Sequence, residues 1–153
     1  MPEIKKVLIA NRGEIAVRVI HSCKELGIKT VTVYSRPDAT SPHVMLADES
    51  IFIGEAASSE SYLVMDKIID AAKQTNADAI HPGYGFLSEN ASFSERCEKE
   101  GIIFIGPKAK AITVMGDKTA ARELVTKLGI PTPPGLKSEL KDLEEASRVA
   151  DEI

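Results

Sequence analysis

The residues best suited to chemistry gather in one stretch, residues 81–90. It reads His-Pro-Gly-Tyr-Gly-Phe-Leu-Ser-Glu-Asn and follows the short, mostly apolar run 77–80. Gly83 and Gly85 flank Tyr84, so the backbone on either side can adopt positive φ angles or approach a ligand closely. Strand-to-helix connections usually have roughly 2–6 residues, and this one is longer. The stretch is therefore a candidate binding loop, in which Tyr84 and the glycine amides could line a pocket for a small planar or anionic ligand.

Other polar residues in this stretch have plain structural interpretations. Glu89 and Asn90 are well placed to cap the helix that follows. His81, which precedes Pro82, is predicted to be a hydrogen-bonded structural residue. The remaining histidines and the two cysteines lack the spacing of a metal site or of a disulfide framework. No nucleophile–base pair is visible, so the sequence predicts neither catalytic residues nor metal ligands.

A second candidate is the stretch 11–14, Asn-Arg-Gly-Glu, which follows the first predicted strand. A dinucleotide site would have the pattern G-x-G-x-x-G there, and only Gly13 is present. Glu14 would repel a pyrophosphate at the start of the next helix. These residues oppose an oxidoreductase with a nicotinamide cofactor, and an ordinary turn before a capped helix is the favoured interpretation.

Lys118 is the third candidate. It directly follows Asp117, a good N-cap residue, and so stands at the start of a predicted helix. A cation is poorly placed at the positive end of the helix dipole, which weakly suggests an anionic partner such as a phosphate. For lysines in general, exposure to solvent is the far commoner explanation.

Composition narrows the class of protein. The chain has 153 residues, is 43% hydrophobic and 27% charged, and carries a net charge of −4. This length can bury a real core, and the charge predicts no bulk attraction to nucleic acid or to an acidic membrane. No apolar run reaches the ~20 residues of a membrane-spanning helix. The two cysteines and the absence of a signal peptide favour a reducing compartment, the cytoplasm.

Hydrophobic periodicity predicts an alternating α/β fold. Apolar runs predict strands at 7–10, 30–34, 51–53, 78–80 and 102–105. Helical spacing predicts helices at 14–26, 61–74 and 91–100, the first with Leu26 on its apolar stripe. The polar stretch 35–42 is predicted to be a loop. Such alternation indicates a Rossmann-like open parallel sheet whose ligand-binding loops share the carboxyl edge.

The last third of the chain has a different pattern. A short helix at 108–114 leads to a second helix that Asp117 begins and Gly129 ends. The proline-rich stretch 130–135 is typical of a stiff linker, and a charged helical pattern starts near Glu139. The pattern reaches Ile153 without a cap or a following strand, so we expect the chain to continue.

Four segments carry a resemblance to a known family: residues 10–16, 81–90, 104–107 and 115–118. In order and spacing they resemble biotin carboxylase, the ATP-grasp component of biotin-dependent carboxylases, over essentially the whole chain. The match in 81–90 is the most specific of the four. The resemblance implies that residues 1–114 form the Rossmann-like N-terminal, pre-ATP-grasp domain and that residues 115–153 begin the ATP-grasp domain.

The resemblance also implies a reaction. In this family MgATP and bicarbonate give carboxyphosphate, whose CO2 is passed to biotin on a carrier protein. Lys118 falls on the family's ATP-binding lysine, and Tyr84 and Gly85 fall on the loop that faces biotin and bicarbonate. The Gly-rich lid, the metal-binding glutamates for Mg2+ and the arginine of the carboxylation site have no counterpart here. We therefore expect this segment alone to be inactive.

Partners follow from the same resemblance. They are the biotin carboxyl carrier protein, the carboxyltransferase component and a second copy of the chain. In the dimer the first helix would lie at the interface, with Arg18 and Glu25 able to pair across a two-fold axis. A solvated charged face is the structural alternative. The expected compartment is the cytoplasm, or the mitochondrial matrix of a eukaryote.

One alternative from another class stays open. The chain would then be a non-catalytic Rossmann-like module, complete as it stands, that binds a nucleotide or a regulator or only dimerises. The proline-rich linker and the uncapped end of the pattern favour the ligase.

Overall fold

The computed structural model describes residues 3–133 and 142–152. The chain divides into two compact units, Met1–Ala109 and Lys110–Ile153. The division falls at the start of a helix, α5 (Ala109–Gly116), which also contains the predicted boundary at residue 114. Each unit is described by itself.

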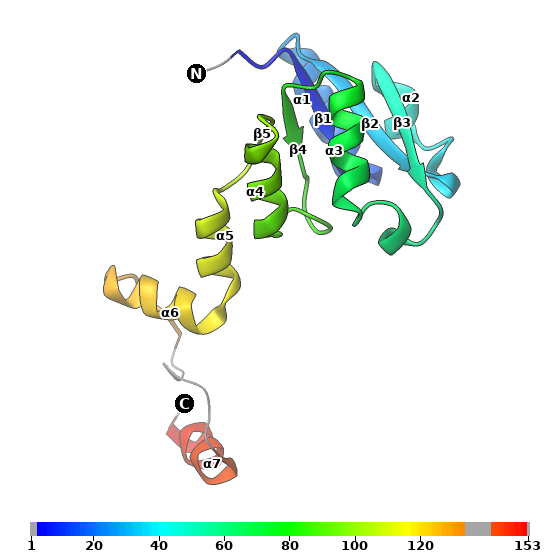
Figure 1. Cartoon of the computed structure of the whole chain (residues 1–153). Coiled ribbons are helices and arrows are strands. Elements are labelled where there is room, and N and C mark those ends of the chain that lie inside the picture. Colours follow the sequence, from blue (N-terminus) through cyan, green and yellow to red (C-terminus); the bar gives the residue numbers. More distant parts are fainter. Residues whose placement is uncertain (1–2, 134–141, 153) are drawn as a thin grey trace. The chain divides into compact units, whose positions relative to one another are not determined.

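A five-stranded parallel sheet forms the first unit. Its strands lie in the order β3-β2-β1-β4-β5. They are β1 (Lys6–Ile9), β2 (Lys29–Ser35), β3 (Glu49–Gly54), β4 (Ala79–His81) and β5 (Ile103–Phe104). All five predicted strands are thus present, and the predicted parallel arrangement is confirmed (Figure 1).

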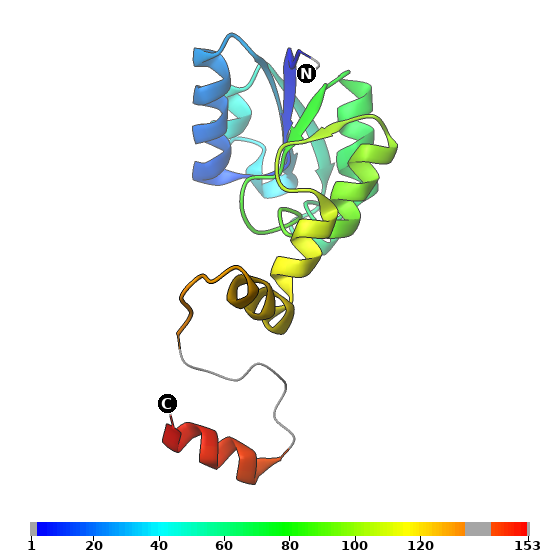
Figure 2. The ribbon, with the colours of Figure 1, turned by 90° about the vertical axis from the view of Figure 1, so that its left-hand side faces the viewer.

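Helices cover both faces of this sheet (Figure 2). On one side lie α1 (Gly13–Glu25) and α2 (Pro42–Leu46); on the other lie α3 (Met65–Gln74) and α4 (Ala91–Lys99). Alternate side chains of β1 point to opposite faces. Val7 and Ile9 therefore pack with α1, whereas Leu8 packs in the larger cluster with α3 and α4. Strands buried on both faces explain the continuous apolar runs of the sequence.

Two helical segments differ from the predictions. The predicted helix 61–74 begins only at Met65, because the backbone angles of Ser61 (φ −138°, ψ −95°) and Val64 (φ −87°, ψ 97°) are not helical. The predicted loop 35–42 contains a 3-10 helix, Arg36–Asp38, and leads directly into α2. Proline at the first helical position favours such a start, since its missing N–H would have no partner there. A second 3-10 helix, Ser58–Glu60, follows β3.

Leu26 was predicted to lie on the apolar stripe of the first helix, and this is wrong. Leu26 is 74% exposed, whereas Val19 and Cys23 on the same stripe are buried. The helix ends at Glu25, and Leu26 is the C-cap before Gly27, whose φ of 71° turns the chain. Leu26 therefore leaves the helical spacing that would have carried it into the core.

The second unit contains α5, α6 (Lys118–Lys127) and α7 (Leu143–Glu152). Asp117 caps α6 as predicted, because its carboxylate accepts a hydrogen bond from the Ala120 amide at 2.8 Å. Gly129 ends the helix with a φ of 71°. The predicted helix start near Glu139 and the end of the predicted linker lie outside the described residues. Where the structure describes the chain, none of its helices is long and apolar enough to cross a membrane.

Candidate functional site

Three loops come together at the carboxyl edge of the sheet. They follow β1, β2 and β4, and hydrogen bonds join them. The chain leaves β1 toward β2 and β3 on one side, then crosses back to β4 and β5 on the other. Open α/β sheets bind ligands at such a switch in strand order. The geometry therefore places the candidate site where the loops after β1 and β4 face each other.

The loop after β4 combines a fixed backbone with an exposed aromatic side chain. Gly83 and Gly85 have φ angles of 65° and 66°, as their types predicted. Phe86 also has a positive φ, 41°, which is unusual for a bulky residue. Leu87 is 2% exposed and anchors the loop in the core, whereas Tyr84 is 63% exposed. The loop thus presents Tyr84 to solvent from a backbone held at both ends.

Two structural interpretations of this loop are confirmed. The ring of His81 accepts a hydrogen bond from the Gly83 amide at Nδ1, over 3.0 Å, and burial lowers the pKa of His81. The side-chain Oδ1 of Asn90 accepts a hydrogen bond from the Phe93 amide at 3.0 Å and caps α4. Glu89 was the other predicted cap, but the N-cap residue is Asn90, and Glu89 is exposed at this end of the loop. These residues shape the loop, and Tyr84 and Gly85 carry its outward surface.

Asn11 joins the loop after β1 to the loop after β4. Its residue is 3% exposed, and its Nδ2 donates to the carbonyl oxygens of Pro82 and Tyr84, each at 2.8 Å. Its Oδ1 accepts from the Arg12 amide at 2.9 Å. The register Ile9↔His81 brings Asn11 opposite this part of the chain. The favoured interpretation of residues 11–14, an ordinary turn, therefore understates what Asn11 does.

Asp38 forms the centre of a buried polar network beside these loops. Its residue is 3% exposed, and its Oδ2 accepts from Arg12 Nε at 2.8 Å, from Ser35 Oγ at 2.8 Å and from the Tyr62 hydroxyl at 2.7 Å. Arg12 Nη2 donates to the other carboxylate oxygen. The hydrogen bonds from Arg12 above all, and those from Tyr62 and Ser35, hold the pKa of Asp38 well below its ordinary value against the opposing effect of burial. Asp38 therefore stays ionised at neutral pH.

Tyr62 connects this network to the glycine-containing loop. Its ring stacks on Phe86 with 5.0 Å between centroids and 13° between planes. Its hydroxyl donates to Asp38 and accepts from the Ser35 amide at 3.0 Å. Burial, together with the neighbouring carboxylate, raises the pKa of Tyr62 to about 12. The unusual φ of Phe86 is thus supported by a ring that is itself fixed by hydrogen bonds.

Lys118 lies in the other unit, as the first residue of α6, and it is exposed. No carboxylate within 3–133 or 142–152 forms an ion pair with it. An exposed ammonium group at this position could pair with a phosphate oxygen. Those same ranges contain no group of three or more histidine, cysteine, aspartate or glutamate residues that could hold a metal ion.

The family described as "Biotin carboxylase, N-terminal domain" matches residues 3–112 of the chain. The chain belongs to this family. The matched range contains the whole sheet, all three loops of the candidate site, and α1 to α4. The family predicted from the sequence motifs is therefore confirmed, and the Rossmann-like sheet is the fold of a biotin carboxylase N-terminal domain.

Individual relatives agree with the family. Biotin carboxylase 1 of Bacillus subtilis is 54% identical over 150 residues, which are 98% of this chain and 33% of that protein. The mitochondrial methylcrotonoyl-CoA carboxylase subunit alpha of Dictyostelium discoideum is 59% identical over 136 residues, 89% of this chain and 20% of that protein. The chain thus spans about a third or less of the length of these relatives.

Solved structures match equally well. The biotin carboxylase domain of Hydrogenobacter thermophilus 2-oxoglutarate carboxylase, a dimer in complex with MgADP, ADP and bicarbonate, superposes with a TM-score of 0.91 at 52% identity. That comparison covers 100% of this chain and 34% of the other. A biotin carboxylase–β-γ-ATP complex from Campylobacter jejuni gives a TM-score of 0.92 at 49% identity, covering 98% of this chain and 34% of that one.

Sequence reasoning missed the residues that hold the site together. Asp38 was placed in a polar loop, and Tyr62 was placed in a helix that begins three residues later, at Met65. Asp38 and Tyr62 lie 24 residues apart along the chain, and Arg12 lies 26 residues from Asp38, so no local pattern reveals these contacts. The one signal was the unusual run after β1, where Asn11 and Arg12 follow an apolar strand in place of a glycine-rich turn.

Proposed function

We propose that this chain is the N-terminal part of a biotin carboxylase. This is an ATP-dependent ligase that carboxylates biotin on a carrier protein with bicarbonate, by way of carboxyphosphate. The observation that supports it best is the loop 81–90, whose exposed Tyr84 stands between two glycines of positive φ at the switch in strand order. A relative named biotin carboxylase is similar to this chain in sequence, and a biotin carboxylase domain bound to MgADP and bicarbonate is similar in both sequence and fold.

Each candidate residue receives one role in this proposal. Tyr84 and Gly85 form the side of the site that faces biotin and bicarbonate. Lys118 binds ATP through its phosphates, because an exposed ammonium group stabilises phosphate oxygens. Residues 115–153 would begin the ATP-grasp domain. The metal-binding glutamates that the family uses for Mg2+ are assigned to a part of the enzyme outside this segment.

Fixation of carbon-14 bicarbonate onto free biotin tests the function. The complete polypeptide that carries this chain should fix bicarbonate only when ATP is present. The 153-residue chain alone should not, because stabilisation of the transition-state charge needs groups that the family places elsewhere. A complete polypeptide without ATP-dependent fixation would overturn the proposal. Turnover by the 153-residue chain alone would refute the claim that essential catalytic groups lie outside it.

Replacement of Lys118 by methionine is predicted to raise the KM for ATP by roughly tenfold to a hundredfold. The estimate follows from the ~1.5–3 kcal/mol that a hydrogen bond to a charged group contributes. Lys127→Met is the matched control, since Lys127 is an exposed lysine at the other end of α6. Steady-state kinetics with varied ATP should separate the two variants; equal KM values would remove Lys118 from the ATP site.

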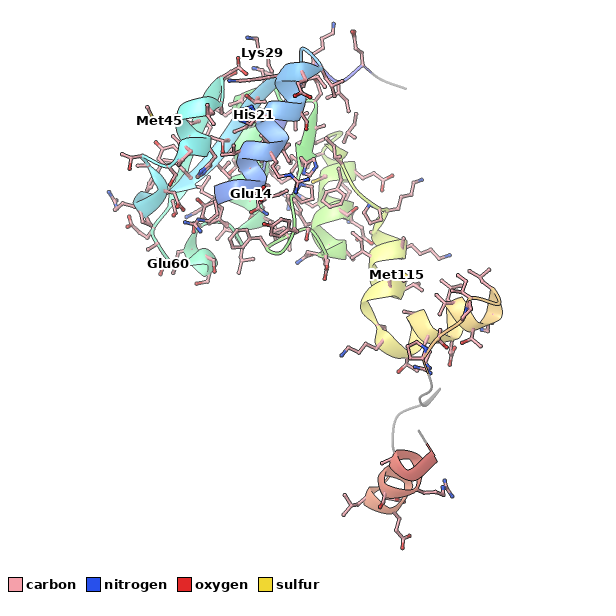
Figure 3. The ribbon with its side chains drawn as sticks, turned by 180° about the vertical axis from the view of Figure 1, so that it is seen from behind. Glu14, His21, Lys29, Met45, Glu60 and Met115 are labelled. Atoms are coloured by element: carbon pink, nitrogen blue, oxygen red, sulfur yellow. The ribbon has the colours of Figure 1, made fainter. Side chains whose placement is uncertain are left out.

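The same proposal includes a carrier protein, a carboxyltransferase component and a homodimer formed through α1. The outward face of α1 is uncovered within the first unit, with Glu14 and His21 along it (Figure 3). A groove of about 350 Å³ beside this helix is lined mainly by apolar side chains, including Val19, Leu26 and Ile28. Arg18 and Glu25 are exposed, and Arg18 lies 3.7 Å from Glu14 of its own helix. An apolar groove with charged margins supports an isologous contact.

Charge reversal at Arg18 tests the dimer. Arg18→Glu should shift the complete polypeptide toward the monomer in sedimentation velocity, since it places like charges together across the proposed two-fold axis. Lys99→Glu on α4 is the control, because Lys99 is exposed on the opposite face of the sheet. An unchanged sedimentation coefficient for Arg18→Glu would count against α1 as the interface.

We infer the cytoplasm, or the mitochondrial matrix of a eukaryote, as the compartment. Both cysteines are free and buried, which fits a reducing environment.

A further inference from the structure

We propose that Asn11 is a positioning residue for biotin. This inference rests on the proposed function, in which Tyr84 and Gly85 face the substrate. Asn11 would not touch biotin. It would fix the backbone that carries Tyr84, and thereby set where the tyrosine ring and the Gly85 amide lie.

The first observation is the pair of hydrogen bonds from one amide group. Asn11 Nδ2 donates to the Pro82 and Tyr84 carbonyl oxygens, at 2.8 Å each, and so spans the residue between them. An amide NH2 has two donors, and both are used here. The orientation is determined, since the reverse placement would set Oδ1 against two carbonyl oxygens. Asn11 thus holds the loop backbone on both sides of Gly83, and we call this pair of hydrogen bonds the clamp.

The second observation is that Gly83 is shaped to admit Asn11. A Cβ atom at Gly83 would lie 2.6 Å from Asn11 Nδ2 and 2.9 Å from its Cγ, with φ at 65°. Glycine is therefore required both by the backbone angle and by the close approach of the Asn11 side chain. Gly85 has a similar φ, but a Cβ there would meet nothing within 4 Å. The two glycines consequently have different roles: Gly83 leaves room for the Asn11 side chain, whereas no atom of the protein packs where a side chain at Gly85 would begin.

The third observation is that Asn11 is itself immobilised. Its residue is 3% exposed, and its Oδ1 accepts from the Arg12 amide. The preceding Ala10 amide donates to the His81 carbonyl at 2.9 Å and extends the pairing of β1 with β4. Arg12 in turn is held by Asp38. The clamp is therefore built on the central strand of the sheet, and Tyr84 itself remains 63% exposed.

Substitution Asn11→Asp tests the assignment in the complete polypeptide. It keeps the size of the side chain but replaces the donating NH2 by an oxygen that faces two carbonyl oxygens. We expect kcat/KM for free biotin to fall about 10- to 100-fold, the penalty of a misplaced binding group, with the KM for ATP unchanged. Amide hydrogen exchange at Gly83, Tyr84 and Gly85 should become faster, because their loop loses its clamp.

Asp78→Asn is the matched control. Asp78 Oδ2 accepts from the Lys5 and Lys6 amides, also at 2.8 Å each, but at the amino edge of the sheet. Asparagine keeps one acceptor oxygen but loses the charge, so the substitution weakens a comparable pair of hydrogen bonds away from the site. It should lower thermal stability without changing kcat/KM for biotin. If both variants lose kcat/KM for biotin equally, Asn11 is merely structural and the proposal is overturned.

A second variant covers the case in which Asn11→Asp does not fold. In Gly83→Ala the new methyl group would clash with Asn11 and break its hydrogen bonds to the two carbonyl groups. This variant should therefore show the same fall in kcat/KM for biotin and an unchanged KM for ATP. Asn11→Ser shortens the clamp and relieves that clash, so Gly83→Ala should cost less in its background than in the wild type. A folded variant at either position with wild-type kcat/KM for biotin overturns the proposal.

The wild type separates this inference from the proposed function. A complete wild-type polypeptide that fixes no bicarbonate refutes the function and the positioning role together. An active wild type with unaffected variants refutes the positioning role alone.

Discussion

Replacing Phe93 with alanine is expected to lower the free energy of unfolding of the first unit by roughly 3–5 kcal/mol. Phe93 is 0% exposed and is among the largest fully buried side chains. It lies in the core cluster of α3 and α4 and meets Phe104 of β5 edge to face, with 6.0 Å between centroids. Alanine would leave a cavity that the packed helix and strands can only partly close, so both the burial and the contacts are lost.

Native-state hydrogen exchange of the β1 and β4 amides measures this loss, since their opening reports the global stability of the sheet. Phe52→Ala is the control, because Phe52 is 47% exposed on the edge strand β3. It should cost roughly 1 kcal/mol or less, in proportion to the smaller apolar area it buries. Equal losses at the two positions would show that Phe93 does not anchor α4.

Asp38→Asn is predicted to have the second large effect, a loss of about 2–3 kcal/mol at neutral pH. The asparagine keeps the shape of the side chain but removes the negative charge to which Arg12, Ser35 and Tyr62 all donate hydrogen bonds. The side chain of Arg12 is 49% exposed, so water can partly replace the carboxylate that the guanidinium group loses. This exposure places the estimate below the full penalty for breaking a buried pair.

The effect of Asp38→Asn should depend on pH in a definite direction. The pKa of Asp38 is lowered in the folded protein, chiefly by Arg12. Its stabilising contribution is therefore complete above the unfolded pKa of about 4 and is lost as the pH falls toward the folded value. Urea unfolding should show a large difference between wild type and variant at pH 7 and a smaller one near pH 3. A difference that stays constant over this range would exclude the ionised carboxylate as the cause.

Asp66→Asn provides the comparison for both pH values. Asp66 is exposed on α3 and lies 3.3 Å from Arg96, with 72% of its side chain accessible. An ion pair of this kind contributes roughly 0–1 kcal/mol. The substitution should leave the urea midpoint almost unchanged, which separates the buried network from charge removal in general.

The sheet could be predicted from the sequence because burial on both faces leaves a local record. Val7, Leu8 and Ile9 form a continuous apolar run whatever their neighbours are, and Gly27 and Gly101 mark helix ends with φ angles of 71° and 72°. The exposed loop was also predictable, since the glycines around Tyr84 adopt the positive φ that their type allows. In each case the residue itself carries the information.

The support of the site could not be predicted in the same way. Asp38 and Tyr62 look like ordinary loop and helix residues until the fold places them 2.7 Å apart. The polar stretch 35–42 was predicted to be a loop, although Pro42 begins α2. Leu26 satisfied the helical spacing but stood one position past the last helical residue. These errors share a cause: long-range contacts and helix ends decide the outcome, and neither has a local pattern.

The strand order also governs when the protein can assemble during its synthesis. β1 is the central strand, and its first partner, β2, follows it closely in the chain. Its second partner, β4, pairs with it in the register Val7↔Ala79, Leu8↔Ile80 and Ile9↔His81, so this pairing must wait until residue 81 has been made. A ribosome adds about 5–20 residues per second, so roughly 4–15 seconds separate the emergence of β1 from that of its second partner. During that interval one edge of an apolar strand has no neighbour to bind. The nascent chain should therefore be more prone to aggregation until residue 81 has left the exit tunnel, and a pause in translation upstream of that point should increase aggregation.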